Sequence, residues 1–305
     1  MRTVAGGTTL IDVEHLGRLR AVASCLLQGD GELALVDPGP TSALGTLRRN
    51  LAEQGIRIAD LTAIFLTHIH LDHAGATGTL VRENPRLRVY VHERGAPHMV
   101  HPTRLLESAT RLYGDQMDRL WGEFVAVPEE NVAALKGGEK VKAAARSIEV
   151  AYTPGHAWHH VTYFDQSNGI AFAGDTGGLR YPGASIATPL TPPPDIDVEA
   201  WLQSIDTIAS RKPQKIFITH FGPFDAVEEH LEDLRRRLRD WARWSEESLG
   251  KGETDEERAS LFAQQVTTDL GRHLSAEELQ HYRNGAGVDD AWQGLARYWR
   301  KRINS

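Results

Sequence analysis

Residues 67–73 constrain this chain more than any other feature, because they place four potential metal ligands within six residues. The segment reads THIHLDH and completes the apolar run LTAIFLT at 61–67, which is typical of a strand buried on both faces. Alternate residues of an extended segment point the same way, so His68 and His70 can reach one ion. Asp72 and His73 lie past the bend into the next helix and can reach a second ion.

Three more ligand-type residues each come directly after an apolar strand. His156 follows the strand expected at 147–153, Asp175 ends the run GIAFAGD at 169–175, and His220 ends KIFITH at 215–220. Polar residues at the ends of neighbouring strands gather on one rim of a sheet, so we expect all of them at one site. Imidazole and carboxylate ligands suit zinc, manganese or iron.

The rest of the chain alternates strand and helix signals, which predicts an α/β fold. Short β runs occupy 8–36, helices are expected at 42–55, 74–83 and 198–210, and further strands at 87–93 and 161–166. The stretch 93–128 has helical periodicity and carries Tyr113, Met117 and Trp121 on one face, either as core packing or as a substrate wall. Beyond Phe224 only helical patterns remain, so we expect a catalytic domain at 1–225 and a helical module at 226–305.

Charge and composition exclude several classes of protein. The 305 residues include 34 Lys and Arg against 41 Asp and Glu, a net charge of -7, which disfavours nucleic acid as a partner. The lone cysteine, Cys25, lies in an expected strand and is assigned to the core. Neither a leader peptide nor a membrane-spanning run is visible, so we expect a cytoplasmic protein without a membrane partner.

Five motifs together resemble the metallo-β-lactamase-fold superfamily over about residues 8–224. They are Asp37-Pro38-Gly39, THIHLDHAG at 67–75, TPGH at 153–156, AGD at 173–175 and TH at 219–220. The resemblance is to the two-metal hydrolase branch that includes glyoxalase II-type thioesterases and lactonases. It implies a four-layer αββα sandwich, here with a helical insertion at about 93–128 and the helical C-terminal module.

The resemblance also implies a role for each ligand in a site with two divalent ions, zinc first, with manganese or iron as alternatives. His68, His70 and His156 would hold one ion, Asp72, His73 and His220 the other, and Asp175 would bridge them. Asp37 and His160 are expected to support these ligands, although capping of a turn is an equally good explanation of Asp37.

Some positions depart from the family pattern or have no assigned place in it. The segment TPGHAWHHV at 153–161 has His159 where many relatives have glycine. We expect His159 to be a surface imidazole, with contact to substrate as the alternative. Tyr181 is either a donor to the substrate or an ordinary exposed loop tyrosine. Three histidines in or beside the insertion are expected to face solvent: His92, His98 and His101.

These residues predict a hydrolase in which a metal-bridging hydroxide attacks a small acyl substrate, a thioester, lactone or other ester. Asp72 and Asp175 would hold or accept the proton of the water. A phosphodiesterase or nuclease, an iron-dependent sulfur dioxygenase and a non-catalytic metal-binding protein remain alternatives. Glutathione as part of the substrate is unsupported, because the C-terminal helices show no matching basic pattern. Those helices could instead shape the acyl pocket or form a homodimer.

Overall fold

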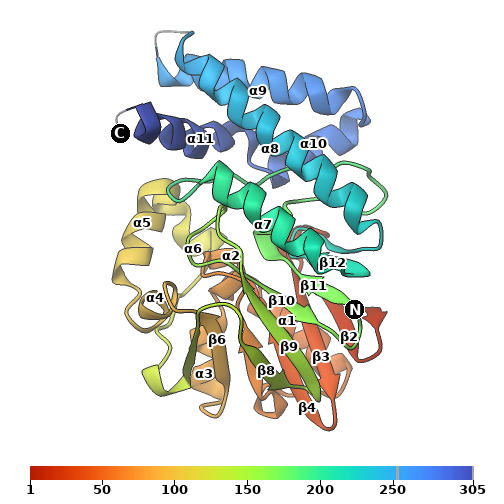
Figure 1. Cartoon of the computed structure of the whole chain (residues 1–305). Coiled ribbons are helices and arrows are strands. Elements are labelled where there is room, and N and C mark those ends of the chain that lie inside the picture. Colours follow the sequence, from red (N-terminus) through yellow and green to blue (C-terminus); the bar gives the residue numbers. More distant parts are fainter. Residues whose placement is uncertain (252–253, 304–305) are drawn as a thin grey trace.

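The computed structural model describes residues 1–251 and 254–303. Its strands form two sheets (Figure 1). The inner faces of these sheets share one hydrophobic core. The first sheet has seven strands in the order β1-β2-β3-β4-β5-β6-β7. Neighbours pair antiparallel from β1 to β4 and parallel from β4 to β7. These strands are β1 (Arg2–Ala5), β2 (Thr8–Asp12), β3 (Ala23–Gly29), β4 (Glu32–Val36), β5 (Ala63–Phe65), β6 (Arg88–His92) and β7 (Val132–Leu135).

The second sheet has six strands in the order β13-β12-β11-β10-β9-β8. Only β11 and β12 pair in parallel, and the other neighbours are antiparallel. The strands are β8 (Lys140–Ala143), β9 (Arg146–Tyr152), β10 (Val161–Asp165), β11 (Ile170–Phe172), β12 (Lys215–Ile218) and β13 (Gly222–Phe224).

Aromatic residues fill much of the space between the sheets. The ring of Phe65 stacks on Tyr90 at a centroid distance of 4.8 Å and meets the edge of Tyr163 at 5.1 Å. These contacts join β5 and β6 of the first sheet to β10 of the second. Cys25 is buried in the same core, as expected from its place in an N-terminal strand.

Helices cover the outer face of each sheet. Leu47 and Leu51 of α1 (Leu44–Glu53) and Leu80 of α3 (Thr77–Glu83) are fully buried against the first sheet. Trp201, Ile205 and Ile208 of α7 (Val198–Ser210) repeat at helical spacing and belong to the core on the other side of the second sheet. The result is the predicted four-layer αββα sandwich, which is therefore confirmed.

The insertion departs from the single helical stretch expected at 93–128. It contains α4 (Ala96–Val100), α5 (Thr103–Tyr113) and α6 (Met117–Leu120). The chain breaks after Tyr113 because Gly114 adopts a φ of 54°, a conformation that favours glycine over other residues. Tyr113, Met117 and Trp121 consequently do not share one straight helix.

The C-terminal region is helical throughout its described part. It consists of α8 (Val227–Leu249), α9 (Asp255–Gly271), α10 (Ala276–Gly285) and α11 (Val288–Ile303), which lie beyond α7 in Figure 1. Trp241, Phe262 and Tyr282 from these helices join Trp201 of α7 in one hydrophobic cluster. Within the described ranges, no helix has both the length and the apolar character needed to cross a membrane.

Candidate metal centre

The predicted ligands follow strands of both sheets that end at the same edge of the sandwich. The segment that carries His68 and His70 leaves β5, and α2 (Leu71–Ala74) begins directly afterwards and carries Asp72 and His73. Asp37 follows β4, the parallel neighbour of β5. Because parallel strands have their carboxyl ends at one edge, these residues start close together.

The second sheet supplies the other three ligands in the same way. β9, β11 and β12 run in the same direction, since β10 is antiparallel to both β9 and β11 and β12 is parallel to β11. His156 follows β9, Asp175 lies in the 3-10 turn Gly174–Gly177 after β11, and His220 follows β12. The structure thus brings all seven predicted ligands to one edge.

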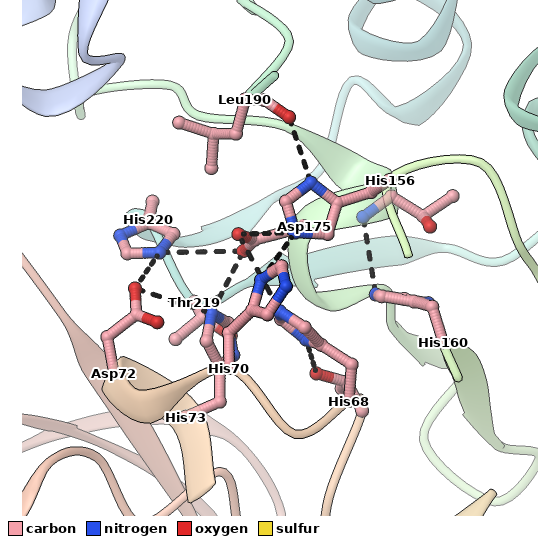
Figure 2. A network of polar contacts seen from close by, with 12 residues as sticks. His68, His70, Asp72, His73, His156, His160, Asp175, Leu190, Thr219 and His220 are labelled. Atoms are coloured by element: carbon pink, nitrogen blue, oxygen red, sulfur yellow. Dashed lines mark hydrogen bonds and ion pairs between the residues drawn. The ribbon is translucent and has the colours of Figure 1, made fainter. Parts of the chain in front are cut away.

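The seven side chains form two groups with one carboxylate between them (Figure 2). Within each group the candidate ligand atoms lie within 4.8 Å of one another; the groups are His68, His70, His156 and Asp175, and Asp72, His73 and His220. Asp175 also faces the second group, because its Oδ1 lies 3.1 Å from Nε2 of His73 and 3.5 Å from Nε2 of His220. Its Oδ2 lies 3.5 Å from Nε2 of His156.

The unsatisfied atoms of the site fit metal ions. Nε2 of His68 is buried and forms no hydrogen bond within the described residues. Nε2 of His73 and Oδ1 of Asp175 are buried as well, and their contacts there are the ion pairs of the site itself. Buried polar atoms that lack hydrogen bonds are costly, so a ligand is expected where these three atoms meet. Two imidazole nitrogens, Nδ1 of His70 and Nε2 of His156, also face each other at 2.9 Å. Nitrogen and carboxylate donors in this number suit two divalent ions.

The protonation tendencies also favour cation binding. Burial and the neighbouring imidazoles hold the pKa of His68 well below its ordinary value, so this ring stays neutral. Burial acts to raise the pKa of Asp175, but His73 and His220 outweigh it and hold that pKa well below its ordinary value. Burial likewise acts to lower the pKa of His73, but three carboxylates, led by Asp175, raise it well above normal. The negative charge of the carboxylates therefore favours the binding of cations, and metal ions would supply that positive charge.

Asp37 makes the contacts of a supporting residue. Its Oδ2 lies 2.9 Å from Nδ1 of His73 and accepts the hydroxyls of Thr67 at 2.7 Å and Thr219 at 3.0 Å. Its Oδ1 accepts the backbone N–H of Thr67 at 2.8 Å. Since Thr67 precedes His68 and Thr219 precedes His220, one buried carboxylate ties together the segments that carry ligands of both groups. None of these bonds caps the turn of Asp37 itself.

The hydrogen bonds of His160 join it to segments that lie next to predicted ligands. It forms no hydrogen bond to a predicted ligand within the described residues. Its Nδ1 lies 3.0 Å from Oγ1 of Thr153, and its Nε2 accepts the backbone N–H of Thr176 at 3.3 Å. His160 therefore holds the loop that carries Asp175, and its ring packs 5.1 Å from that of His68.

Two backbone carbonyls orient ligands and were not predicted. The carbonyl of Leu190 lies 2.8 Å from Nδ1 of His156, and that of Ala21 lies 2.8 Å from Nδ1 of His220. Each contact leaves Nε2 of the imidazole directed into the site. Every residue has a backbone carbonyl, so the type of residue in the sequence does not indicate which carbonyl will contact a ligand.

The metal centre opens onto a cavity of about 490 Å³ between the insertion and the C-terminal helices. Tyr113 and Trp121 line this cavity, whereas Met117 does not. Tyr113 and Trp121 thus form part of a cavity wall beside the metal centre, where the substrate-wall alternative requires them to lie. The segment 284–287 and two residues of α11 close another side of the cavity.

His159 and Tyr181 do not lie where they were expected. His159 is only 8% exposed and lines the cavity, with its ring 5.5 Å from that of His70. The surface interpretation is wrong because the loop of His159 folds against the backbone at Ile69. The hydroxyl of Tyr181 donates to the carbonyl of His281 at 3.2 Å, so this side chain anchors α10 and does not line the cavity.

The three histidines of the insertion have different environments. His92 is buried and stacks on Tyr152 at 4.4 Å, so its predicted exposure is wrong. His98 is half-buried and lines the cavity, which also corrects the prediction. His101 is exposed, as predicted.

An αββα sandwich with two such groups of His and Asp at one sheet edge defines a metallo-hydrolase class of protein. A family model described as the metallo-beta-lactamase superfamily matches residues 17–220. The chain belongs to this superfamily.

Individual relatives agree with this assignment. The chain is 28% identical over 179 residues to a metallo-beta-lactamase fold-containing protein, ST1585, of Sulfurisphaera tokodaii, covering 57% of this chain and 66% of that protein. It is 34% identical over 143 residues to a hydroxyacylglutathione hydrolase of Synechococcus sp. (strain JA-2-3B'a(2-13)), covering 47% and 43%. The matches therefore span less than two thirds of these relatives. The crystal structure of metallo-beta-lactamase family protein TTHA1429 from Thermus thermophilus superposes with a TM-score of 0.72 at 25% identity, over 99% of this chain and 95% of that one.

Proposed function

We propose that this protein is a metal-dependent hydrolase that cleaves a small acyl substrate, a thioester, lactone or other ester. The observation that carries the proposal is the pair of ligand groups joined by Asp175 at the floor of a cavity. The hydroxyacylglutathione hydrolase among the relatives, which this chain matches over 43% of its length, supports the acyl class. Zinc is the proposed metal, with manganese or iron as alternatives.

The chain provides the ligands and the proton acceptors for such a reaction. Two divalent ions held by the seven residues would lower the pKa of water and polarise the scissile carbonyl. The Asp72 side chain is 21% exposed, whereas Asp175 is almost fully buried. Asp72 is therefore the carboxylate placed to take a proton from water in the cavity, and Asp175 holds the two groups together.

No protein nucleophile competes with water in this proposal. The thiol of Cys25 is fully buried in the core between the sheets, where burial raises its pKa. The hydroxyl of Ser108 lines the cavity, but in the described part of the chain no histidine or carboxylate is hydrogen-bonded to it as a base. Water is thus the nucleophile that the site supports best.

Metal analysis and a substrate panel test the proposal. We expect about two metal ions per chain, and turnover of thioesters, lactones or aryl esters that a chelator abolishes and added metal restores. The D175N variant should lose both metal and turnover, whereas D60N, at a surface carboxylate paired with Arg57, should keep both. Hydrolysis of bis-nitrophenyl phosphate alone would contradict the acyl assignment. Iron with oxygen uptake would indicate the dioxygenase instead, and tight metal binding without any turnover would indicate a non-catalytic protein.

A further inference from the structure

The insertion presents an apolar helix face to the cavity, and only Leu105 at one end of this face also packs against the core of the first sheet among the described residues. Leu105, Ala109 and Leu112 recur at helical spacing on α5 and line the cavity. None of the residues of α5 is buried. An amphipathic helix normally buries its apolar face against the core. Because this face lines the cavity instead, a ligand in the cavity can contact it.

The opposite walls of the cavity are apolar as well. Leu190 and Pro192 contribute from the loop before α7, and Ala286 and Ala291 contribute from the C-terminal helical region. Three parts of the chain that are distant in sequence therefore enclose a hydrophobic space next to the metal ligands. Such a space suits an aliphatic or aromatic acyl chain.

Apart from the predicted ligands, the charged side chains in the described lining of this space are acidic. Among the described residues that line the cavity there is no Lys or Arg. Besides the predicted ligands Asp72 and Asp175, the lining includes Asp195 and Asp290. Asp195 is half-buried and forms no hydrogen bond or ion pair within the described part of the chain.

We infer that the substrate carries an apolar acyl chain and no negative charge away from the scissile bond, and that Asp195 selects it against anionic thioesters. This inference rests on the proposed function, because it names the substrate class of the same site. A glutathione or coenzyme A thioester would bring carboxylates or phosphates into a space whose described lining, away from the metal ligands, has no Lys or Arg to receive them. A neutral or positively charged leaving group meets no such repulsion, and a positive one is attracted by Asp195.

Binding to the metal-free protein tests the charge preference separately from catalysis. The probes are hexyltrimethylammonium, 1-hexanol and 1-hexanesulfonate, which share one alkyl chain, and calorimetry reports their dissociation constants after chelator treatment. We expect the ammonium to bind at least about tenfold more tightly than the sulfonate. D195N should reduce the ratio of the sulfonate dissociation constant to the ammonium dissociation constant severalfold. The matched control is E107Q, which removes an equal charge from an exposed position of α5 outside the cavity lining and should leave the ratio unchanged.

Turnover by the metal-loaded enzyme gives the second measurement. Hexanoylthiocholine and the N-acetylcysteamine thioester should exceed 3-(hexanoylthio)propionate in kcat/KM, and D195N should reduce the advantage of the thiocholine ester. Equal or tighter binding of hexanesulfonate, or no binding of any probe, would overturn the inference. If D195N narrows the preference for the cationic probe but no thioester is hydrolysed, the selection by Asp195 stands and the proposed hydrolase activity fails.

Discussion

At the scale of single residues, Asp37 contacts segments that carry ligands of both groups, because its Oδ2 faces His73, Thr67 and Thr219. Its carboxylate accepts from Thr67 and Thr219 and faces Nδ1 of His73. In D37N an amide group replaces one oxygen, so a donor faces other donors in a buried place. We expect the dissociation constant of the metal to rise about tenfold to a hundredfold, measured by competition with a chromogenic chelator.

The control for D37N has to separate loss of orientation from loss of folding. D60N changes a surface aspartate to the same residue and should leave metal affinity unchanged. Circular dichroism should show that D37N is folded, and excess metal should restore its activity. Metal affinity equal to that of the natural chain would show that Asp37 does not position the ligands.

The same residues show what the sequence can and cannot predict. His68 to His73 were predictable because consecutive residues are held together by the chain itself. His159 was not, because its burial depends on how its loop meets the backbone at Ile69. The places of Asp195 and Ala286 in the cavity wall were also not predictable, since these two residues lie about ninety positions apart in the sequence.

At the scale of elements, the strands that sequence patterns missed are all sheet edges. β1 and β7 end the first sheet, and β8 and β13 end the second. Each has only three or four residues and includes half-buried or exposed positions, so neither an apolar run nor a clear alternation marks it. The central strands were predictable because burial on both faces selects continuous apolar residues.

The apolar face of α5 leads to a prediction about substrate binding. L112A removes a side chain that lines the cavity, so we expect KM for an apolar acyl substrate to rise about fivefold to tenfold. The free energy of unfolding should change by less than about 1 kcal/mol, because Leu112 is only half-buried. L106A is the matched control, since Leu106 is also half-buried but lies outside the cavity lining. Equal effects of the two variants on KM would contradict this assignment of α5.

The contact of α8 with the turn that carries Asp175 makes stability depend on pH. Nε2 of His230 lies 2.7 Å from the carbonyl of Gly177 in a buried position, and burial lowers the pKa of His230 from 6.5 to about 4. The unfolded chain therefore binds a proton more readily than the folded chain between these two values. Stability from this residue is complete above pH 6.5 and is lost as the pH falls toward 4.

Replacement of His230 by a residue that does not titrate isolates this effect. Between pH 7.5 and pH 5, we expect H230Q to lose about 2 kcal/mol less free energy of unfolding than the natural chain, measured by urea titration with chelator present. H273Q is the control because His273 is exposed on the same helical region, and it should follow the natural chain. Parallel pH profiles for H230Q and the natural chain would refute the role of His230.

At the scale of the whole molecule, the C-terminal helices share a hydrophobic cluster with the helix that covers the second sheet. The family model ends at residue 220 and the sequence pattern changes at about 225, which would place a domain boundary before α8. Yet a single hydrophobic cluster contains Trp201 of α7, Trp241 of α8 and Tyr282 of α10. The hydroxyl of Tyr282 also donates to the carbonyl of Ile186 at 2.6 Å.

Removal of the helices should therefore destabilise the catalytic part as well. A chain ending at residue 225 would expose the apolar side of α7, where each uncovered large side chain costs about 1.5–3 kcal/mol. We expect this truncated chain to aggregate or to melt without cooperativity, as seen by size-exclusion chromatography and near-ultraviolet circular dichroism. The full-length W241A variant, with an expected loss of about 3–5 kcal/mol, tests the same contact without changing chain length. A monodisperse truncated chain that melts cooperatively and binds metal like the full chain would show that the sandwich folds independently and that the helices serve only to enclose the cavity.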